Sequence, residues 1–349
     1  MPLPTTCIGA YPKPDYVPIK DWFQIGHDSE NYNENVLHGW NNSESEEAEK
    51  LLDRATREAI ADQIACGIDV PTDGEIRRDN YVHYQCRHFS GFDFENLTER
   101  VLRNGAYTAH LPTIRGPVKH TGNSVLVRDW KMAEKAAGRP VKITLPGPMT
   151  ISDTTANEYY DSPQAQAEDL AIALNTEILA LVDAGCTHIQ VDEPIFARKP
   201  DAALQFGVRT LSKCFEGVPE TVTTAIHMCC GYPSKLDDDE YPKANPGSYL
   251  EIAKAVDGVA GQISIEDAHR HNPAELFSLF EKSALIVGFV KIASSQLETV
   301  EQIRIRMLEI LDLLPKERVI AAPDCGLGFL GRDLAMSKLK NLCSAAKSV

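Results

Sequence analysis

The sequence predicts an α/β protein, a single (β/α)8 TIM barrel that occupies residues 1–349. Three observations favour this fold. Short apolar, β-rich segments recur along the chain, and most precede a longer stretch with helical periodicity, as in a parallel sheet with crossover helices. Barrels of this kind reach such a length as one domain. Neither a repeat of about 20 to 50 residues nor a low-complexity linker divides the chain.

Eight predicted strands follow one another along the chain. They cover residues 7–10, 68–75, 141–146, 188–194, 223–229, 261–266, 285–292 and 319–325. Helical periodicity lies between several of them, at residues 45–65, 164–184, 246–256 and 298–314. The least regular segment, 91–137, is predicted to be an insertion or a hairpin after the second strand.

The composition argues against nucleic acids and membranes as binding partners. The formal net charge of −15 argues against a nucleic-acid surface, because that binding depends on clustered Lys and Arg. No apolar run approaches the roughly 18 residues of a membrane helix, and the N-terminus resembles neither a signal peptide nor a lipidation motif. We therefore expect a cytoplasmic protein that binds small molecules, with no nucleic acid and no membrane as partner.

Polar residues stand at the ends of five predicted strands. They are Gly74-Glu75, Asp192-Glu193-Pro194, His227-Met228-Cys229, Glu266-Asp267 and Asp324-Cys325-Gly326. In a (β/α)8 barrel the C-terminal ends of all strands open onto one face, where active sites lie. We therefore expect these distant residues to converge.

Some of these residues have the chemistry of zinc ligands. In a strand, His227 and Cys229 lie on one face and Cys230 on the other. Zinc prefers imidazole and thiolate in tetrahedral geometry, and Cys325 and Glu266 offer a third and a fourth ligand. The competing interpretation is structural, since buried Cys commonly acts as a small core hydrophobe. The nine cysteines, irregularly spaced, favour reduced thiols over a disulfide framework.

Six runs of sequence carry a resemblance to a known family. They are TTCIGAYPKP, DVPTDGEIRRDNY, THIQVDEPIFA, AIHMCC, QISIED and PKERVIAAPDCGLG. Together they resemble successive motifs of the cobalamin-independent methionine synthases, over nearly the whole chain. The resemblance is to the catalytic barrel alone, whereas full-length members carry two barrels.

The resemblance implies a TIM barrel, of a type shared with uroporphyrinogen decarboxylases, and a zinc ion held by His227, Cys229, Glu266 and Cys325. Zinc removes the proton of a coordinated thiol, so the sulfur becomes a nucleophile without a general base. We expect Glu266 to leave the ligand set when the thiol binds, because a carboxylate is the least thiophilic of the four. Asp192 and Glu266 are the predicted catalytic residues.

The resemblance also implies a site for homocysteine. Asp192 and Glu75 would hold its amino group, and the backbone around Ile8 and Gly9 would meet its carboxylate. Ala10 stands where the family has Ser. Without the resemblance, Asp192 and the next residue would be interpreted as a solvated loop or helix cap.

Two departures from the family concern the methyl donor. The family motif D-I-H-S-P-R, whose His is thought to assist the folate leaving group, aligns with residues 291–296, where Ala293 replaces that His. The Trp that follows the family motif G-P-x-T is absent after residues 147–150. We therefore expect a donor other than folate, either a corrinoid or an unidentified alkyl donor.

Three further functions stay open. Epoxyalkane:coenzyme M transferases use the same zinc chemistry, and the sulfonate of coenzyme M would need cations, for which Arg77, Arg78 and Lys291 are candidates. Asp192 and Glu75 favour the amino group of homocysteine instead. The second function is that of a decarboxylase-like barrel without zinc, and the third is that of a non-catalytic barrel that binds zinc or a thiol.

Four histidines lie near the presumed open face of the barrel. They are His83, His88, His269 and His271. Loop histidines are mostly solvated, and these four are left out of the predicted ligand set although each is a candidate for proton transfer.

Overall fold

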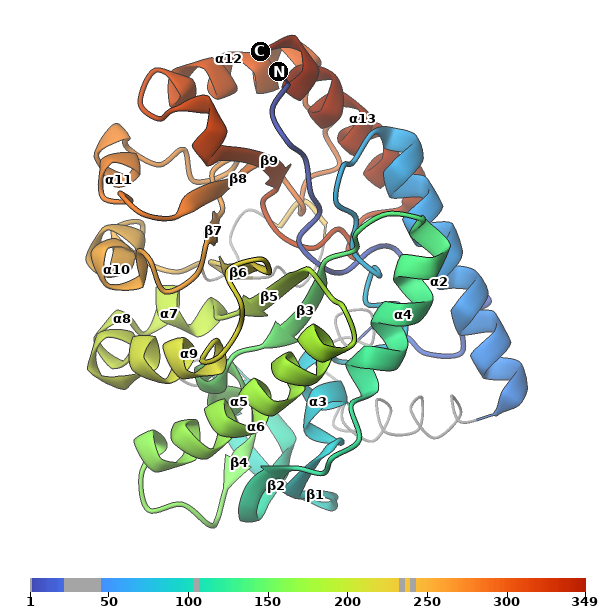
Figure 1. Ribbon diagram of the computed structural model, residues 1–349, viewed down its shortest axis with the longest axis vertical. Coiled ribbons are helices and arrows are strands. Elements are labelled where there is room, and N and C mark those ends of the chain that lie inside the picture. The colour runs from blue at the N-terminus through green and yellow to red at the C-terminus, as the bar shows by residue number, and fades with distance from the viewer. Residues whose placement is uncertain (1, 22–44, 103–106, 232–235, 239–242) are drawn as a thin grey trace.

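The structure, a computed structural model, describes residues 2–21, 45–102, 107–231, 236–238 and 243–349. Its centre is a six-stranded parallel sheet in the order β3-β5-β6-β7-β8-β9 (Figure 1). The strands are β3 (Ile143–Pro146), β5 (His188–Asp192), β6 (Thr223–Met228), β7 (Gln262–Ile265), β8 (Ala284–Val290) and β9 (Val319–Pro323). Each agrees to within two residues with a predicted strand, and the predicted α/β class with a parallel sheet is confirmed.

The first two predicted strands, 7–10 and 68–75, are not regular strands. Single parallel bridges stand in their place and link the two edges of the sheet. They join Thr5 to Ala321, Thr6 to Val70, and Thr72 to Lys142. Pro71 gives a physical reason in the second segment: proline has no N–H for a ladder, and only its carbonyl takes part, as the acceptor of the Lys142 N–H.

Helices lie around the outside of the strands (Figure 1). They are α2 (Glu46–Cys66), α3 (Tyr81–Cys86), α4 (Val125–Ala137), α5 (Pro148–Thr154), α6 (Pro163–Asp183), α7 (Pro194–Arg198), α8 (Pro200–Ala202), a π-helical turn η3 (Ala203–Gly207), α9 (Val208–Cys214), α10 (Ser248–Val256), α11 (Ala274–Ser278), α12 (Val300–Leu311), a 3-10 turn η4 (Lys316–Arg318) and α13 (Arg332–Ser348). The four predicted helices correspond to α2, α6, α10 and α12. The Ser45 side chain caps the start of α2, and Gly67, with φ of 102°, ends it.

The segment 91–137 contains most of an antiparallel hairpin and then α4. The hairpin pairs β1 (Phe89–Leu102) with β2 (Tyr107–His120), and β4 (Ala156–Asn157) adds a short parallel strand to β2. This second sheet lies at the lower end of the molecule in Figure 1, beside α3 and α5. It supplies one wall of the cleft described below.

Alternate residues of the central strands belong to two apolar clusters. Ile226 and Val319 belong to the large cluster that also includes the buried residues of the helices. The small cluster consists of Ile8, Ala225, Ile286, Ile320 and Ala322. Because neighbours on a strand face opposite ways, the small cluster lies on the inner face of the sheet. His227 follows Ala225 by two positions and therefore also faces inward.

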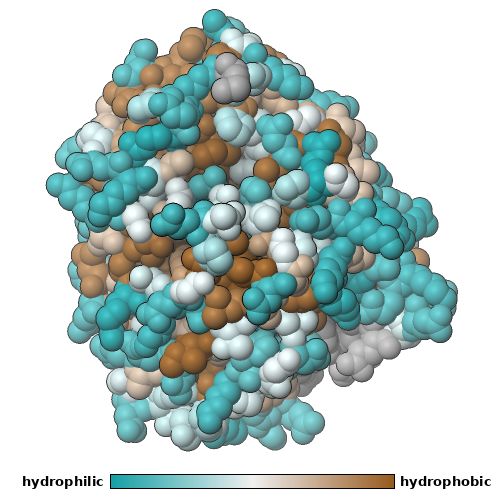
Figure 2. Space-filling view, in the orientation of Figure 1, coloured by the Kyte–Doolittle hydropathy of each residue, from teal (hydrophilic) through white to brown (hydrophobic). Residues whose placement is uncertain are grey.

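The surface carries both hydrophobic and hydrophilic residues. On the face shown in Figure 2, hydrophobic residues gather near the centre and toward the upper edge, and hydrophilic residues predominate on the right. Among the described residues, no helix is long and apolar enough to cross a membrane.

Candidate metal centre and thiol site

His227, Cys229 and Cys325 meet on the inner face of the sheet. His227 lies in β6, Cys229 follows that strand, and Cys325 follows β9. The Nε2 atom of His227 is 3.4 Å from Sγ of Cys325, and the two sulfur atoms are 3.6 Å apart. For usual bond lengths, two ligands of a tetrahedral zinc lie about 3.6 Å apart for N and S and about 3.8 Å apart for two S atoms. These two separations are close to those of a tetrahedral zinc site, and the ligand atoms of all three side chains lie within 4.8 Å of one another.

The neighbouring strand orients the imidazole of His227. Its Nδ1 atom is 2.8 Å from Oγ of Ser264, which is its register partner on β7. The other ring nitrogen is therefore the one that faces the two sulfur atoms. Metal-binding histidines are commonly held in this way through the nitrogen that does not bind the metal.

Glu266, the fourth predicted ligand, lies beside this group in a second cluster with His269 and Asp324. One of its carboxylate oxygens accepts the N–H of Cys230 at 2.8 Å, and the other is 3.1 Å from Nε2 of His269. The Nδ1 atom of His269 is 2.8 Å from Asp324. Glu266 is only 2% exposed and does not line the cleft. Its carboxylate therefore lies behind the three other predicted ligands.

The thiols of Cys229 and Cys325 differ in the direction of their pKa shifts. The thiol of Cys325 donates a hydrogen bond to Cys229 and holds the pKa of Cys229 well below its usual value, with smaller contributions from His227 and Glu266. The same contact, together with burial, raises the pKa of Cys325. Burial and the neighbouring Cys229 raise the pKa of Glu266. The thiolate is the form in which a cysteine binds a metal.

The side-chain amide of Gln190 bridges Asp192 and Ile8. The Nε2 group of Gln190 donates to Oδ1 of Asp192 at 2.7 Å and to the carbonyl of Ile8 at 2.8 Å. Asp192 is the register partner of His227, so its carboxylate lies next to the metal-ligand set. Burial raises the pKa of Asp192 to about 7, and the nearby His227 opposes this.

Glu75 occupies a strained turn. Its φ of 54° is unusual for a residue with a side chain, and its carboxylate accepts a hydrogen bond from the Thr144 hydroxyl at 2.7 Å. Gly9 approaches this carboxylate so closely that a Cβ atom there would lie 2.6 Å from Oε1 of Glu75. The predicted substrate residues Ile8, Gly9, Glu75 and Asp192 all line the same cleft.

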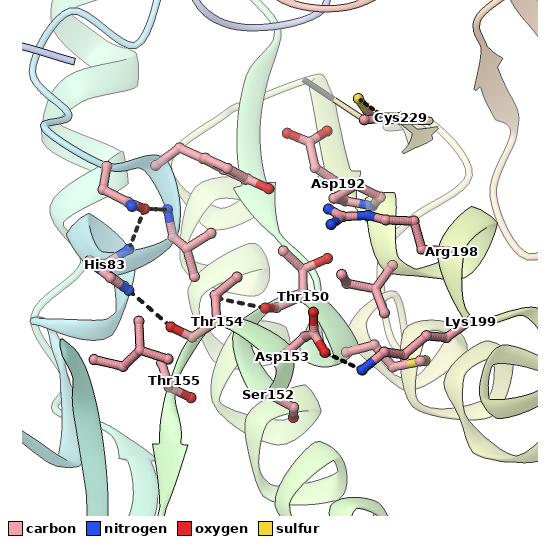
Figure 3. Close-up of a pocket in the computed structure, with 18 of the residues that line it drawn as sticks. His83, Thr150, Ser152, Asp153, Thr154, Thr155, Asp192, Arg198, Lys199 and Cys229 are labelled. Atoms are coloured by element: carbon pink, nitrogen blue, oxygen red, sulfur yellow. Dashed lines mark hydrogen bonds and ion pairs between the residues drawn. The ribbon is translucent and has the colours of Figure 1, made fainter. Parts of the chain in front are cut away.

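That cleft has a volume of about 1570 Å³ and also includes His227, Cys229 and Cys325. It extends from these residues to α5 and to the hairpin, where Val101 and His110 line it. Figure 3 shows Asp192, Cys229 and Arg198 at one end, and His83 and Thr155 farther along. Since ligand pockets commonly measure about 300–1,000 Å³, the cleft has room for a second, larger substrate beside a small thiol.

The predicted sulfonate-binding cations are not available to a ligand. Arg77 donates to Glu49 and to Asp53, and it does not line the cleft. Arg78 lines the cleft, but its guanidinium donates to the Thr144 carbonyl at 2.8 Å and pairs with Asp73 and Glu75. Lys291 is exposed and lies outside the cleft. Of the four singled-out histidines, His269 alone joins the second cluster, and His83 lines the cleft with one ring nitrogen near the carbonyl of Thr154.

Sequence reasoning missed three residues of the site, which are Ser264, Gln190 and Arg198. Ser264 precedes Glu266 by two positions and Gln190 precedes Asp192 by two, so each lies on the inner face of its own strand. That alternation was a usable signal. Arg198 lies in the last turn of α7, and His269, which was left out of the ligand set, follows β7. No spacing in the sequence reveals that either residue lies at the site.

The fold and the site define a class of protein: a parallel-sheet α/β protein whose strand ends bring one imidazole and two thiol groups together. The sequence model of the cobalamin-independent synthase catalytic domain matches residues 3–348. The chain belongs to this family. A corrinoid partner gains no support, since the family is cobalamin-independent.

Individual relatives agree with that assignment. The methionine synthase of Sulfolobus acidocaldarius is 32% identical over 342 residues, which cover 97% of this chain and 90% of the relative. The methionine synthase of Saccharolobus solfataricus is 31% identical, over 99% of this chain and 95% of the relative. Among solved structures, a B12-independent methionine synthase from Shewanella sp. W3-18-1, in complex with selenomethionine, superposes with a TM-score of 0.84 at 29% identity, covering 100% of this chain and 98% of that one.

Proposed function

We propose that this chain is a zinc-dependent methyltransferase that forms methionine from homocysteine, with residues 1–349 acting as one catalytic barrel. The observation that carries the proposal is the convergence of His227, Cys229 and Cys325, at distances of 3.4 and 3.6 Å. Glu266 is proposed as the fourth ligand. The methionine synthases among the relatives, aligned over nearly the whole chain, support the choice of reaction.

The donor set fits zinc. Two sulfurs, one imidazole and a buried carboxylate are the ligand types that zinc prefers over harder cations. Zinc, when bound, deprotonates a coordinated thiol and so makes its sulfur nucleophilic at neutral pH. The chain's own residues prepare the site: Ser264 orients His227, and the Cys230 N–H donates to the carboxylate of Glu266, with His269 beside it.

Asp192 and Glu75 are proposed to hold the amino group of homocysteine, and the backbone at Ile8 and Gly9 to meet its carboxylate. Two carboxylates at one end of the cleft attract an ammonium group, which homocysteine carries and coenzyme M lacks. The Shewanella structure contains selenomethionine, the selenium analogue of the product proposed here. Both points favour an amino-acid thiol over coenzyme M.

The methyl donor is proposed to be a molecule other than a folate. Ala293 cannot transfer the proton that the family's His is thought to supply, and it does not line the cleft. The volume of the cleft, about 1570 Å³, leaves room for a donor much larger than homocysteine.

The test begins with metal content and thiol binding. We expect one zinc per chain by elemental analysis, and an added sulfur ligand at the zinc X-ray absorption edge with homocysteine but not with coenzyme M. Cys325→Ser should lose most of its zinc and its activity. Cys230→Ala is the matched control, because Cys230 lies next to Cys229 but belongs to the large outer core cluster, and it should keep its zinc. Full zinc content and activity in Cys325→Ser would refute the assignment.

A further inference from the structure

Two buried polar groups of opposite character have no hydrogen-bond partner among the described residues. They are the amine of Lys142, which donates when charged, and Oε1 of Gln190, which accepts. Lys142 is 3% exposed and Gln190 is 0% exposed, and neither lines the cleft. Buried polar groups are nearly always paired, so two complementary exceptions in one part of a fold call for a common explanation.

The strands place the two side chains on the same face of the sheet. Thr144 and Gln190 are register partners on β3 and β5. Lys142 precedes Thr144 by two positions, so alternation puts it on the inner face with both of them. One strand spacing and two residues of rise separate the α-carbons of Lys142 and Gln190 by roughly 8 Å, a distance that a lysine side chain can largely span. The ammonium and the amide therefore lie in the same part of the interior.

The electrostatics of Asp192 agree with this placement. Burial lowers the pKa of Lys142 to about 8, and the nearby Asp192 opposes this. Burial raises the pKa of Asp192, and Lys142 is among the groups that oppose that change. The two charges therefore stabilise each other across the interior, although no hydrogen bond joins the Lys142 amine to Asp192.

Gln190 connects this charge to the substrate site. Its Nε2 group donates to Oδ1 of Asp192 at 2.7 Å and to the carbonyl of Ile8 at 2.8 Å. If the amide turned over, its oxygen would face those two oxygens and both hydrogen bonds would be lost. An ammonium attracts the oxygen end of an amide and repels its NH₂ end, and this interaction is strong in an interior of low dielectric constant. Lys142 therefore favours the orientation of Gln190 that bonds Asp192 and Ile8.

We propose that Lys142 is a positioning residue whose ammonium holds the Gln190 amide in the orientation that fixes Asp192 and the Ile8 carbonyl for the amino-acid thiol. The inference rests on the proposed function, in which Asp192 holds the amino group and the backbone at Ile8 and Gly9 meets the carboxylate. Fixing the Ile8 carbonyl also orients the N–H of Gly9, which belongs to the same peptide unit. Lys142 does not line the cleft, so it acts through Gln190 and not by contact with the substrate.

A double-mutant cycle tests this coupling. L-Homocysteine and propane-1-thiol, which lacks the amino and carboxylate groups, are titrated calorimetrically into the zinc-loaded wild type, Lys142→Met, Gln190→Met and the double variant. We expect Lys142→Met to weaken homocysteine binding about 3- to 30-fold, on the scale of one hydrogen bond to a charged group, and to leave propane-1-thiol binding unchanged. The double variant should bind homocysteine as weakly as Gln190→Met alone, because Lys142 acts through Gln190.

Two further variants separate positioning from folding. Lys142→Met removes a buried charge that has no hydrogen-bond partner, so we expect it to fold and to keep its zinc. Its comparison of the two thiols is decisive even if Gln190→Met does not fold. Lys142→Arg keeps the charge and should recover part of the lost homocysteine affinity. Lys135→Met removes a charge from the exposed face of α4 and should bind both thiols like the wild type.

Four results would overturn the inference. Unchanged homocysteine affinity in Lys142→Met would refute it and leave the proposed function standing. An equal loss for both thiols would show a general structural role. Losses that multiply in the double variant would show that Lys142 does not act through Gln190. A wild type that holds zinc but binds homocysteine no more tightly than propane-1-thiol would refute the proposed function, and the inference with it.

Discussion

At the scale of single residues, Glu266 is held in a way that suits a ligand that leaves the metal. One oxygen accepts the Cys230 N–H and the other faces His269, which Asp324 holds in turn. A buried carboxylate that lost its metal and had no other partner would be strongly destabilising. Here the protein supplies partners in advance. If Glu266 left a bound metal, as proposed, its carboxylate would therefore keep the Cys230 N–H as a hydrogen-bond donor.

Lys142 presents the opposite case, a buried cation with no hydrogen-bond partner for its amine. Burial lowers its pKa from 10.5 to about 8, although Asp192 opposes this. The pKa of Lys142 is lower in the folded protein than in the unfolded chain, so the buried ammonium group lowers the free energy of unfolding. This loss of stability is complete below pH 8 and disappears as the pH rises from 8 to 10.5. The shift corresponds to about 3 kcal/mol.

We therefore predict that Lys142→Met is more stable than the wild type by about 3 kcal/mol at pH 7, and by about 1 kcal/mol at pH 10. Urea unfolding of both proteins at the two pH values measures the difference. Lys135→Met removes a charge from the exposed face of α4 and should give no pH-dependent difference. An advantage that grew with pH would contradict the assignment.

At the scale of the elements, β8 lies very close at Gly288 to the residue that follows β9. The register between them shifts by one residue after this position, and a Cβ atom at Gly288 would lie 2.6 Å from Cα of Asp324. Asp324 accepts the backbone N–H groups of Asp267, Ala268 and His269, so it fixes the loop that follows Glu266. The absence of a side chain at Gly288 therefore positions two of the predicted ligands.

We predict that Gly288→Ala destabilises the fold by about 1–3 kcal/mol and weakens zinc binding, because Asp324 and the adjacent Cys325 must shift. Chemical unfolding and competition with a chromophoric chelator measure the two effects. Gly116→Ala serves as control, since a Cβ atom there meets nothing closer than 3.7 Å. Zinc affinity equal to that of the wild type in Gly288→Ala would argue that β9 does not position Cys325.

The regular strands were predictable because they are buried on both faces and therefore read as apolar runs, as in β8 and β9. The segment 68–75 misled the prediction, since Pro71 interrupts a run that is otherwise strand-like. The hairpin strand β1 carries many polar and exposed residues, so no apolar pattern revealed it. Sequence periodicity reports burial, and it is silent where a strand has no buried face.

The same limit applies to the site. His227 and Cys229 were predictable as a pair from alternation along one strand. The pairing of the arginines was not, because Arg77 and Arg78 look alike in sequence, yet Arg77 pairs with the distant Glu49 and Arg78 with the nearby Asp73 and Glu75. Cys325 is separated from Cys229 and His227 by 96 and 98 residues of chain, and they were linked by their positions at the ends of predicted barrel strands, an expectation that the family resemblance strengthened.

At the scale of the whole molecule, the fold does not depend on a metal for its core. The inner and outer faces of the sheet both carry buried apolar residues, and the candidate ligands lie at the ends of strands that this packing already holds. A small zinc domain lacks such a core and unfolds without its ion. In this protein we expect a bound metal to increase the free energy of unfolding of a fold that is already stable without it.

We predict that removal of zinc with a chelator leaves the protein folded, with unchanged far-ultraviolet circular dichroism, but lowers its unfolding midpoint. On the proposed function zinc binds the folded state and not the unfolded chain, so free zinc at roughly 100 times its dissociation constant should contribute about 2.7 kcal/mol. The contribution should disappear in Cys325→Ser and persist in Cys230→Ala. Urea unfolding of the three proteins with chelator or with buffered zinc measures it. Loss of secondary structure on chelation would instead mean that the metal holds the strands together, and the ligands would then have a structural role before a catalytic one.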